Sequence, residues 1–159
     1  MIVVSDSTPI NILIRIGAIE VLKDLFGDVL LTPAVIRELS HSRTPQEVQK
    51  WASQLPPWAQ VRSPRVADKG GRGAGEREAI ALALEMGADF LLVDDHRARR
   101  NAQAHGLSIA GTVGILGFAA ERGLISFVDM IAKLRKTDFR VSSSLIEDAI
   151  MRDAQWRRP

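Results

Sequence analysis

Five acidic side chains fall where a fold of alternating strands and helices would bring them together. Asp6 ends a short apolar run at the N-terminus, and the adjacent Asp94 and Asp95 end a second apolar run. Glu38 and Glu76 each lie near the start of a predicted helix. Gathered carboxylates repel one another, and carboxylate oxygens with water are the ligands that Mg²⁺ or Mn²⁺ prefers. The pattern therefore points to a divalent metal site.

Short apolar strands and amphipathic helices must position these acids. The apolar runs predict four buried strands, over residues 2–5, 29–31, 90–93 and 107–110. Helical spacing and capping residues predict helices over residues 8–16, 18–26, 32–39, 44–55, 75–86, 96–105, 112–122, 126–136 and 143–155.

Residues 56–73 are rich in proline and glycine and predict a connecting loop. Their glycines do not indicate a nucleotide-binding loop, because no apolar strand precedes them and neither glycine motif of such loops is present.

Strands that alternate with helices predict an α/β fold with a mainly parallel sheet covered on both faces. We expect a single domain over residues 1–159, with C-terminal helices from about residue 126. Sites in such sheets form beyond the carboxyl ends of the strands, and each crossover helix begins at that same edge. The five acids are therefore expected at one edge of the sheet.

Each acid also has a purely structural interpretation. Glu76 could favour its helix N-terminus electrostatically, and Asp95 could cap the helix that follows it. Asp94 could pair with Arg97 or Arg99, and Glu38 could be an exposed helical charge. One acid after a strand is weak support for a site, because Asp is common in turns. The coincidence of four separate segments is stronger support.

Composition narrows the possible classes of protein. Hydrophobic residues make up 46% of the 159, which indicates a folded domain. The absence of cysteine excludes disulfides, thiolate zinc sites and thiol catalysis, and it fits a reducing compartment. No signal peptide or membrane-spanning run is apparent, so we expect a cytoplasmic protein that does not contact membranes. Arginine outnumbers lysine, and its planar group suits phosphate.

Five segments carry the acids and their neighbours in a distinctive order: VSDSTPI at 4–10, TPAVIREL at 32–39, GEREAIALA at 75–83, LVDDHRAR at 92–99 and GTVGIL at 111–116. In these segments the chain resembles the PIN-domain family, metal-dependent nucleases that include the VapC-type toxins of bacteria and archaea. The resemblance runs from residue 2 to about residue 140. It implies a three-layer α/β/α sandwich and an acidic cluster that binds Mg²⁺ or Mn²⁺.

The resemblance also assigns roles to the acids. Asp6, Glu38 and Glu76 match the first three family acids, and many members have Asp where this chain has Glu76. The last acid is Asp94 or Asp95, and we favour Asp94 because it directly follows the strand. All five are candidate catalytic residues, and the first three with Asp94 are the expected metal ligands.

Other residues are expected to support these acids. Thr8 matches a hydroxyl position beside the first acid, and Thr112 resembles a late Ser/Thr of the family. Arg99 either pairs with an acid or contacts phosphate. Arg97 and Arg100 on the same predicted helix are candidate contacts for nucleic acid.

The resemblance implies an endoribonuclease that leaves a 3′-hydroxyl and a 5′-phosphate. It further implies the toxin of a toxin–antitoxin pair, with RNA as substrate, a small antitoxin as partner and a homodimer as the assembly. Two alternatives stay open: a catalytically inactive PIN-like binding module and a housekeeping RNA-processing nuclease.

Overall fold

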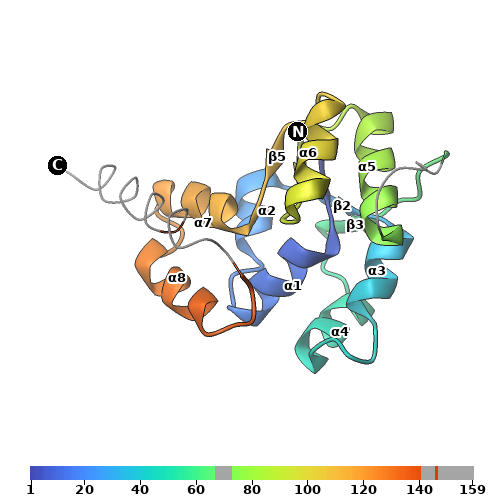
Figure 1. Cartoon of the computed structure of the whole chain (residues 1–159). Coiled ribbons are helices and arrows are strands. Elements are labelled where there is room, and N and C mark those ends of the chain that lie inside the picture. The colour runs from blue at the N-terminus through green and yellow to red at the C-terminus, as the bar shows by residue number, and fades with distance from the viewer. Residues whose placement is uncertain (67–72, 141–145, 147–159) are drawn as a thin grey trace.

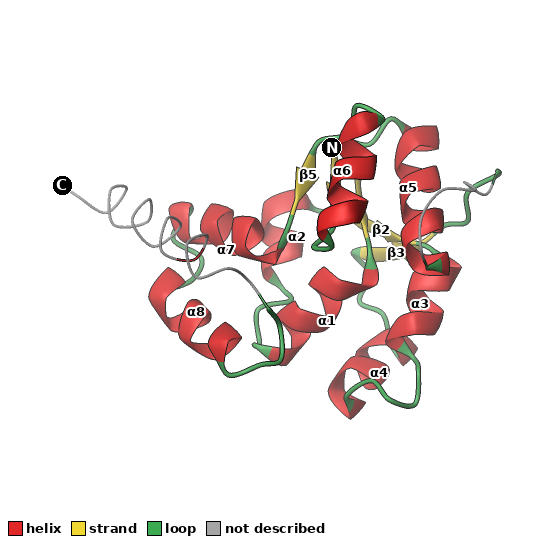
Figure 2. Cartoon of the chain, viewed as in Figure 1, coloured by secondary structure: helices red, strands yellow, loops and turns green. Residues whose placement is uncertain are grey.

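A parallel sheet forms the centre of the fold. The computed structural model of the chain describes residues 1–66, 73–140 and 146. Within them the sheet has five strands in the order β3-β2-β1-β4-β5, and all neighbours are parallel. The strands are β1 (Val3–Ser5), β2 (Val29–Leu31), β3 (Ala59–Val61), β4 (Phe90–Leu92) and β5 (Ile109–Ala110). Figure 2 shows how short they are beside the helices.

Helices connect and cover the strands (Figure 1). In the described part of the chain they are α1 (Ser7–Arg15), α2 (Val21–Phe26), α3 (Pro33–Leu39), α4 (Gln46–Ser53), α5 (Ala74–Met86), α6 (His96–Ala104), α7 (Thr112–Glu121) and α8 (Phe127–Arg135). Among these residues, no helix is long and apolar enough to cross a membrane.

The sheet separates two apolar cores. Val3 and Leu92 face the larger core, which packs against α1, α2, α3, α4, α7 and α8. Val4 and Leu91 face the smaller core, which packs against α5 and α6. Because both faces are covered, the strands are apolar without alternation, as the apolar runs in the sequence predict. Figure 1 shows α7 and α8 at one end of the molecule, α3, α4 and α5 at the other, and α1 between them.

The neighbouring strands β1 and β4 create the place where a site can form. The chain leaves β1 towards β2 on one side and later returns to β4 on the other, so the order of strands reverses between β1 and β4. Ser5 pairs with Leu92, and the Asp6 N–H donates to the Leu92 carbonyl at 2.9 Å. Asp6 and Asp94 therefore leave adjacent strands at the carboxyl edge of the switch point, where ligands of open α/β sheets bind.

The α/β class and the mainly parallel sheet are confirmed, but the prediction of a loop over residues 56–73 is wrong in part. It contains the edge strand β3, in which Ala59 is buried while Gln60 and Val61 are exposed. An edge strand with only one buried residue has no apolar run to reveal it, so its pairing with β2 is decided by tertiary contacts.

Several helix boundaries differ from the predictions, among them that of the second helix, which begins at Val21 and not at residue 18. The first helix begins at Ser7 and not at Thr8, because Asp6 caps it. The fourth begins at Gln46, with Pro45 at the capping position expected for Thr44. The helix expected over 143–155 lies outside the described residues, apart from residue 146.

Candidate active site

Asp6 is an acid whose pKa is strongly raised. It follows β1, is 8% exposed, and its Oδ1 accepts from the Ser7 N–H at 2.8 Å. Burial raises the pKa of Asp6 to about 7, although the Ser7 N–H acts to lower it, and the charges of Glu38, Glu76 and Asp94 raise it further. The four acids therefore act on one another at this edge of the sheet.

Asp94 is held by the start of α7. Its Oδ1 accepts from the Thr112 N–H at 2.7 Å, and its Oδ2 accepts from the Thr112 hydroxyl at 2.6 Å. Burial raises the pKa of Asp94, while both bonds from Thr112 and the charge of Arg99 act in the opposite direction. Thr112 is fully buried, so the carboxylate has a fixed orientation. Gly111 allows this approach, since a Cβ there would lie 2.9 Å from Asp94 Oδ1.

Glu38 is held from two other segments. Its Oε2 accepts from the Ser7 hydroxyl at 2.6 Å, and its Oε1 accepts from the Gly75 N–H at 3.0 Å. A Cβ at Gly75 would lie 2.6 Å from Glu38 Cδ and closer still to both carboxylate oxygens. Glu38 lies in the last turn of the short α3. The sequence predicts it near the start of that helix, so this prediction is wrong. The Glu38 carboxylate still reaches the site, because its donors Ser7 and Gly75 lie in the first turns of α1 and α5, which begin at the same edge of the sheet.

Glu76 completes the group from the first turn of α5. It is half-buried, and its charge is one of the three that raise the pKa of Asp6. Four carboxylates from four segments thus surround the switch point.

The acids fit a hard divalent cation in type and in location. Carboxylate oxygens are what Mg²⁺ and Mn²⁺ prefer, and burial first and then the charges of Glu38, Glu76 and Asp94 raise the pKa of Asp6. Among the described residues, no three acidic or histidine side chains stand close enough to enclose an ion. Hydroxyl and N–H donors instead hold the oxygens of Glu38 and Asp94 in place.

The adjacent aspartates have different environments. Asp95 is exposed, and its Oδ1 accepts from the N–H groups of Arg97 and Ala98 at 2.9 and 3.0 Å. It is therefore the N-cap of α6, one of the two roles considered from the sequence. Arg97 and Arg100 are exposed on α6.

Three residues of the site were missed by sequence reasoning. At the start of α1, the hydroxyl that contacts an acid is that of Ser7, which donates to Glu38, whereas the expected Thr8 is exposed. Gly75 and Gly111 provide space for carboxylates that come from distant segments. For Gly75 and Gly111, the local signal in the sequence is a glycine at the start of a predicted helix.

We expect Gly75→Ala to weaken Mn²⁺ binding by about tenfold, the lower limit for losing a residue that orients a ligand. The new Cβ displaces the Glu38 carboxylate, while the melting temperature does not fall, because Ala is the better helix former. Calorimetric titration measures the affinity. Gly114→Ala is the control, since its Cβ would meet nothing within 4 Å. Unchanged affinity in Gly75→Ala would show that Gly75 does not position Glu38.

We expect Asp6→Asn to stabilise the metal-free protein at high pH. The folded protein keeps a proton on Asp6 up to about pH 7, whereas the unfolded chain loses it near the ordinary value of 3.8. The free energy of unfolding therefore falls as pH rises between these values, and Asn removes that loss while it still caps α1. At pH 8 the gain is roughly 2–4 kcal/mol, and near pH 4 it vanishes.

Urea unfolding in the presence of a chelator measures this difference. Saturating Mn²⁺ should stabilise the wild type more than the variant. Equal stability of the two metal-free proteins at pH 8 would contradict the raised pKa of Asp6.

Comparison with known proteins identifies the family and the fold. A family model described as PIN domain, DUF3368, matches residues 2–155. A solved structure, a PilT N-terminus domain protein of the hyperthermophilic archaeon Sulfolobus solfataricus P2, has a TM-score of 0.51 and 15% identity over 89% of this chain and 100% of that one. At this identity the likeness shows the fold alone. No match was found among curated protein sequences. The chain belongs to the PIN-domain family.

Proposed function

We propose that this protein is a metal-dependent endoribonuclease and the toxin of a toxin–antitoxin pair. PIN domains are typically nucleases and generally use divalent metals. The observation that carries the proposal is the gathering of Asp6, Glu38, Glu76 and Asp94 from four segments at the switch point, where burial and then the charges of the other three raise the pKa of Asp6. Such a concentration of acids is unfavourable for stability, and a bound cation offsets it.

Asp6, Glu38, Glu76 and Asp94 would hold the Mg²⁺ or Mn²⁺. A bound ion of this kind lowers the pKa of water and stabilises charge on a phosphate. The protein contributes the orientation of the acids. Thr112 fixes Asp94 through two hydrogen bonds. Oriented groups of this kind lower the cost of reaching the reactive geometry.

RNA in single strands or loops is the proposed substrate, because its bases and backbone are accessible. Arg97 and Arg100 are exposed on α6, whose N-terminus follows Asp94 and Asp95 directly, and they supply positive charge for the backbone. Arg99 is half-buried, and its charge acts on Asp94, which supports a role in holding that acid.

The toxin role, the small antitoxin and the homodimer are proposed from the resemblance to the toxin branch. The exposed Glu38, the half-buried Glu76 and Asp94, and the buried Asp6 form a negative site, which a basic side chain of an antitoxin would complement.

We expect purified protein to cleave single-stranded RNA with Mn²⁺ or Mg²⁺ and not with a chelator. Asp94→Asn should abolish cleavage with little loss of stability. Asp95→Ala should retain cleavage and lower the free energy of unfolding by about 1 kcal/mol, because it loses the cap of α6. Gel analysis of a panel of labelled RNAs and urea unfolding measure the two properties.

The reverse pattern would identify Asp95 as the last ligand. Intact RNA across the whole panel, with protein shown to bind metal, would remove the nuclease proposal and favour a binding module.

We expect expression of the wild type to slow growth of a bacterial host and Asp94→Asn to restore it, because toxicity requires cleavage. Growth curves at matched protein levels measure this. Asp95→Ala is the control that keeps the site and should stay toxic. Equal growth with wild type and Asp94→Asn would argue for a housekeeping nuclease.

A further inference from the structure

A polar groove leads away from the acids along α1. Two hollows of about 460 and 300 Å³ share Asn11, Arg15, Glu38 and Asp138 among their lining residues, so they adjoin one another. We call the combined feature the Arg15 groove. Because Glu38 is part of its wall, the groove opens directly onto the candidate active site.

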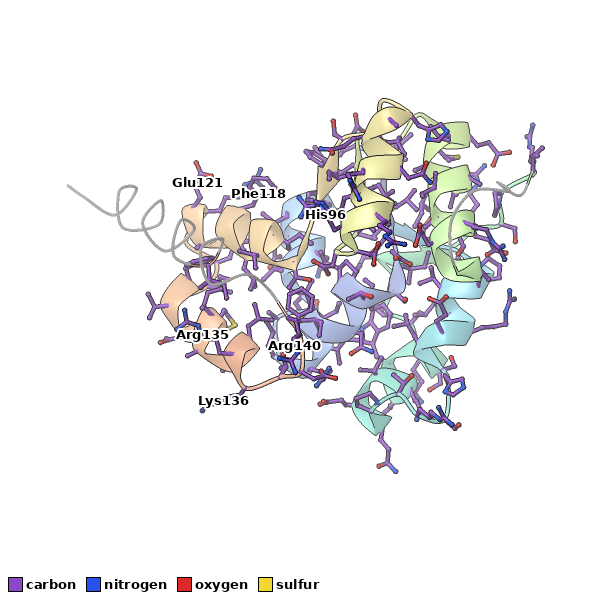
Figure 3. The ribbon with its side chains drawn as sticks, in the orientation of Figure 1. His96, Phe118, Glu121, Arg135, Lys136 and Arg140 are labelled. Atoms are coloured by element: carbon purple, nitrogen blue, oxygen red, sulfur yellow. The ribbon has the colours of Figure 1, made fainter. Side chains whose placement is uncertain are left out.

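Cations line the groove beyond Glu38. Arg15 comes from α1, Arg43 from the connection between α3 and α4, and Arg140 from the segment after α8. Figure 3 places Arg140 between α1 and α8. The acids in the lining are Glu38, at the end nearest the active site, and Asp138. Arginines from three segments therefore line a groove that is acidic at the end nearest the active site.

Arg15 and Asp138 form an ion pair within the groove. Arg15 donates from Nη1 to Asp138 Oδ1 at 2.6 Å. The Arg15 side chain is 23% exposed, whereas that of Asp138 is 82% exposed. The Arg15 side chain is therefore part of the groove wall, and the Asp138 carboxylate lies on the solvent side of Arg15. An exposed ion pair is weak, and a phosphate can replace the carboxylate with two oxygens on the guanidinium.

Asn11 lies between Ser7 and Arg15 on the same face of α1, because residues four apart stack along a helix. Its side-chain oxygen is buried and has no hydrogen-bond partner among the described residues. An unpaired buried acceptor is unfavourable. Because Asn11 lines both hollows, a turn of its side-chain amide towards the groove would present this oxygen to a ribose hydroxyl or a base N–H.

We propose that the Arg15 groove binds the backbone of single-stranded RNA beside the cleavage site, and that Asp138 occupies Arg15 until a phosphate displaces it. Arg15 lies about 12 Å along α1 from Ser7, which is three to four stacked nucleotides at about 3.4 Å each. Asn11 then faces the sugar or base of an intervening nucleotide. This inference rests on RNA being the substrate.

Binding of a fluorescent 12-nucleotide RNA of mixed sequence tests the groove. Anisotropy is measured in chelator, so that metal-dependent cleavage does not interfere. Arg15→Gln should weaken binding about fivefold at 0.1 M salt and lower the slope of log affinity against log salt by about 0.7, the loss of one phosphate contact. Arg122→Gln, at the far end of α7, is the control and should leave both unchanged.

Asp138→Asn should tighten binding about threefold, because Arg15 becomes available without competition. Glu121→Gln is the control for loss of an exposed acid elsewhere. The gain should vanish in the double variant with Arg15→Gln. A gain that persists there would reflect general electrostatics and overturn the displacement by phosphate.

Two further outcomes would overturn the proposal. Arg15→Gln binding as tightly as Arg122→Gln would exclude the phosphate contact. Asp138→Asn weakening binding as much as Arg15→Gln would show that the pair only anchors the segment after α8. If thermal melting shows that Arg15→Gln is unfolded, Asp138→Asn against Glu121→Gln decides alone.

Parallel cleavage assays in Mn²⁺ separate this inference from the proposed nuclease activity. Binding that depends on Arg15 without any cleavage supports the groove and removes the nuclease. Cleavage with binding that is independent of Arg15 keeps the nuclease and removes the groove.

Discussion

The repulsion among carboxylates at the carboxyl edge of β1 and β4 is the constraint around which the structure is organised. Asp6 is buried there, and three further acids raise its pKa. Donors at helix N-termini partly offset this negative charge, because the unpaired N–H groups and the helix dipole there favour anions. The first N–H of α1 bonds Asp6, an N–H in the first turn of α5 bonds Glu38, and the first N–H of α7 bonds Asp94.

The same chemistry has a purely structural use elsewhere in the fold. Asp95 caps α6, and Glu78 accepts from the Ala34 N–H at the start of α3 at 2.8 Å. An acid at a helix start is therefore not by itself a sign of a site. What distinguishes Asp6 and Asp94 is that burial raises the pKa of each, a property that is common among functional acids.

Apart from Arg99, whose charge acts on Asp94, the arginines considered for the substrate lie on the flanks of the acidic centre. Arg97 and Arg100 lie on α6, while Arg15 lies on α1 in a groove that ends at Glu38. A polyanion approaching the acids would be repelled at the centre without a metal and attracted on both sides. This separation lets the flanks hold a nucleic-acid backbone while the centre stays available for a cation, since arginines inside the acidic group would compete with it.

The sequence by itself determined the α/β class, most helices and strands, and the meeting of the acids, since apolar periodicity and helix starts are local properties. The tertiary structure alone decided the edge strand β3, the choice of Ser7 over Thr8, and the space at Gly75. These depend on contacts between distant positions: Ser7 and Glu38 are 31 residues apart, and Glu38 and Gly75 are 37 apart. A local pattern carries no information about which remote side chain will approach, because that is set by the packing of the helices around the sheet.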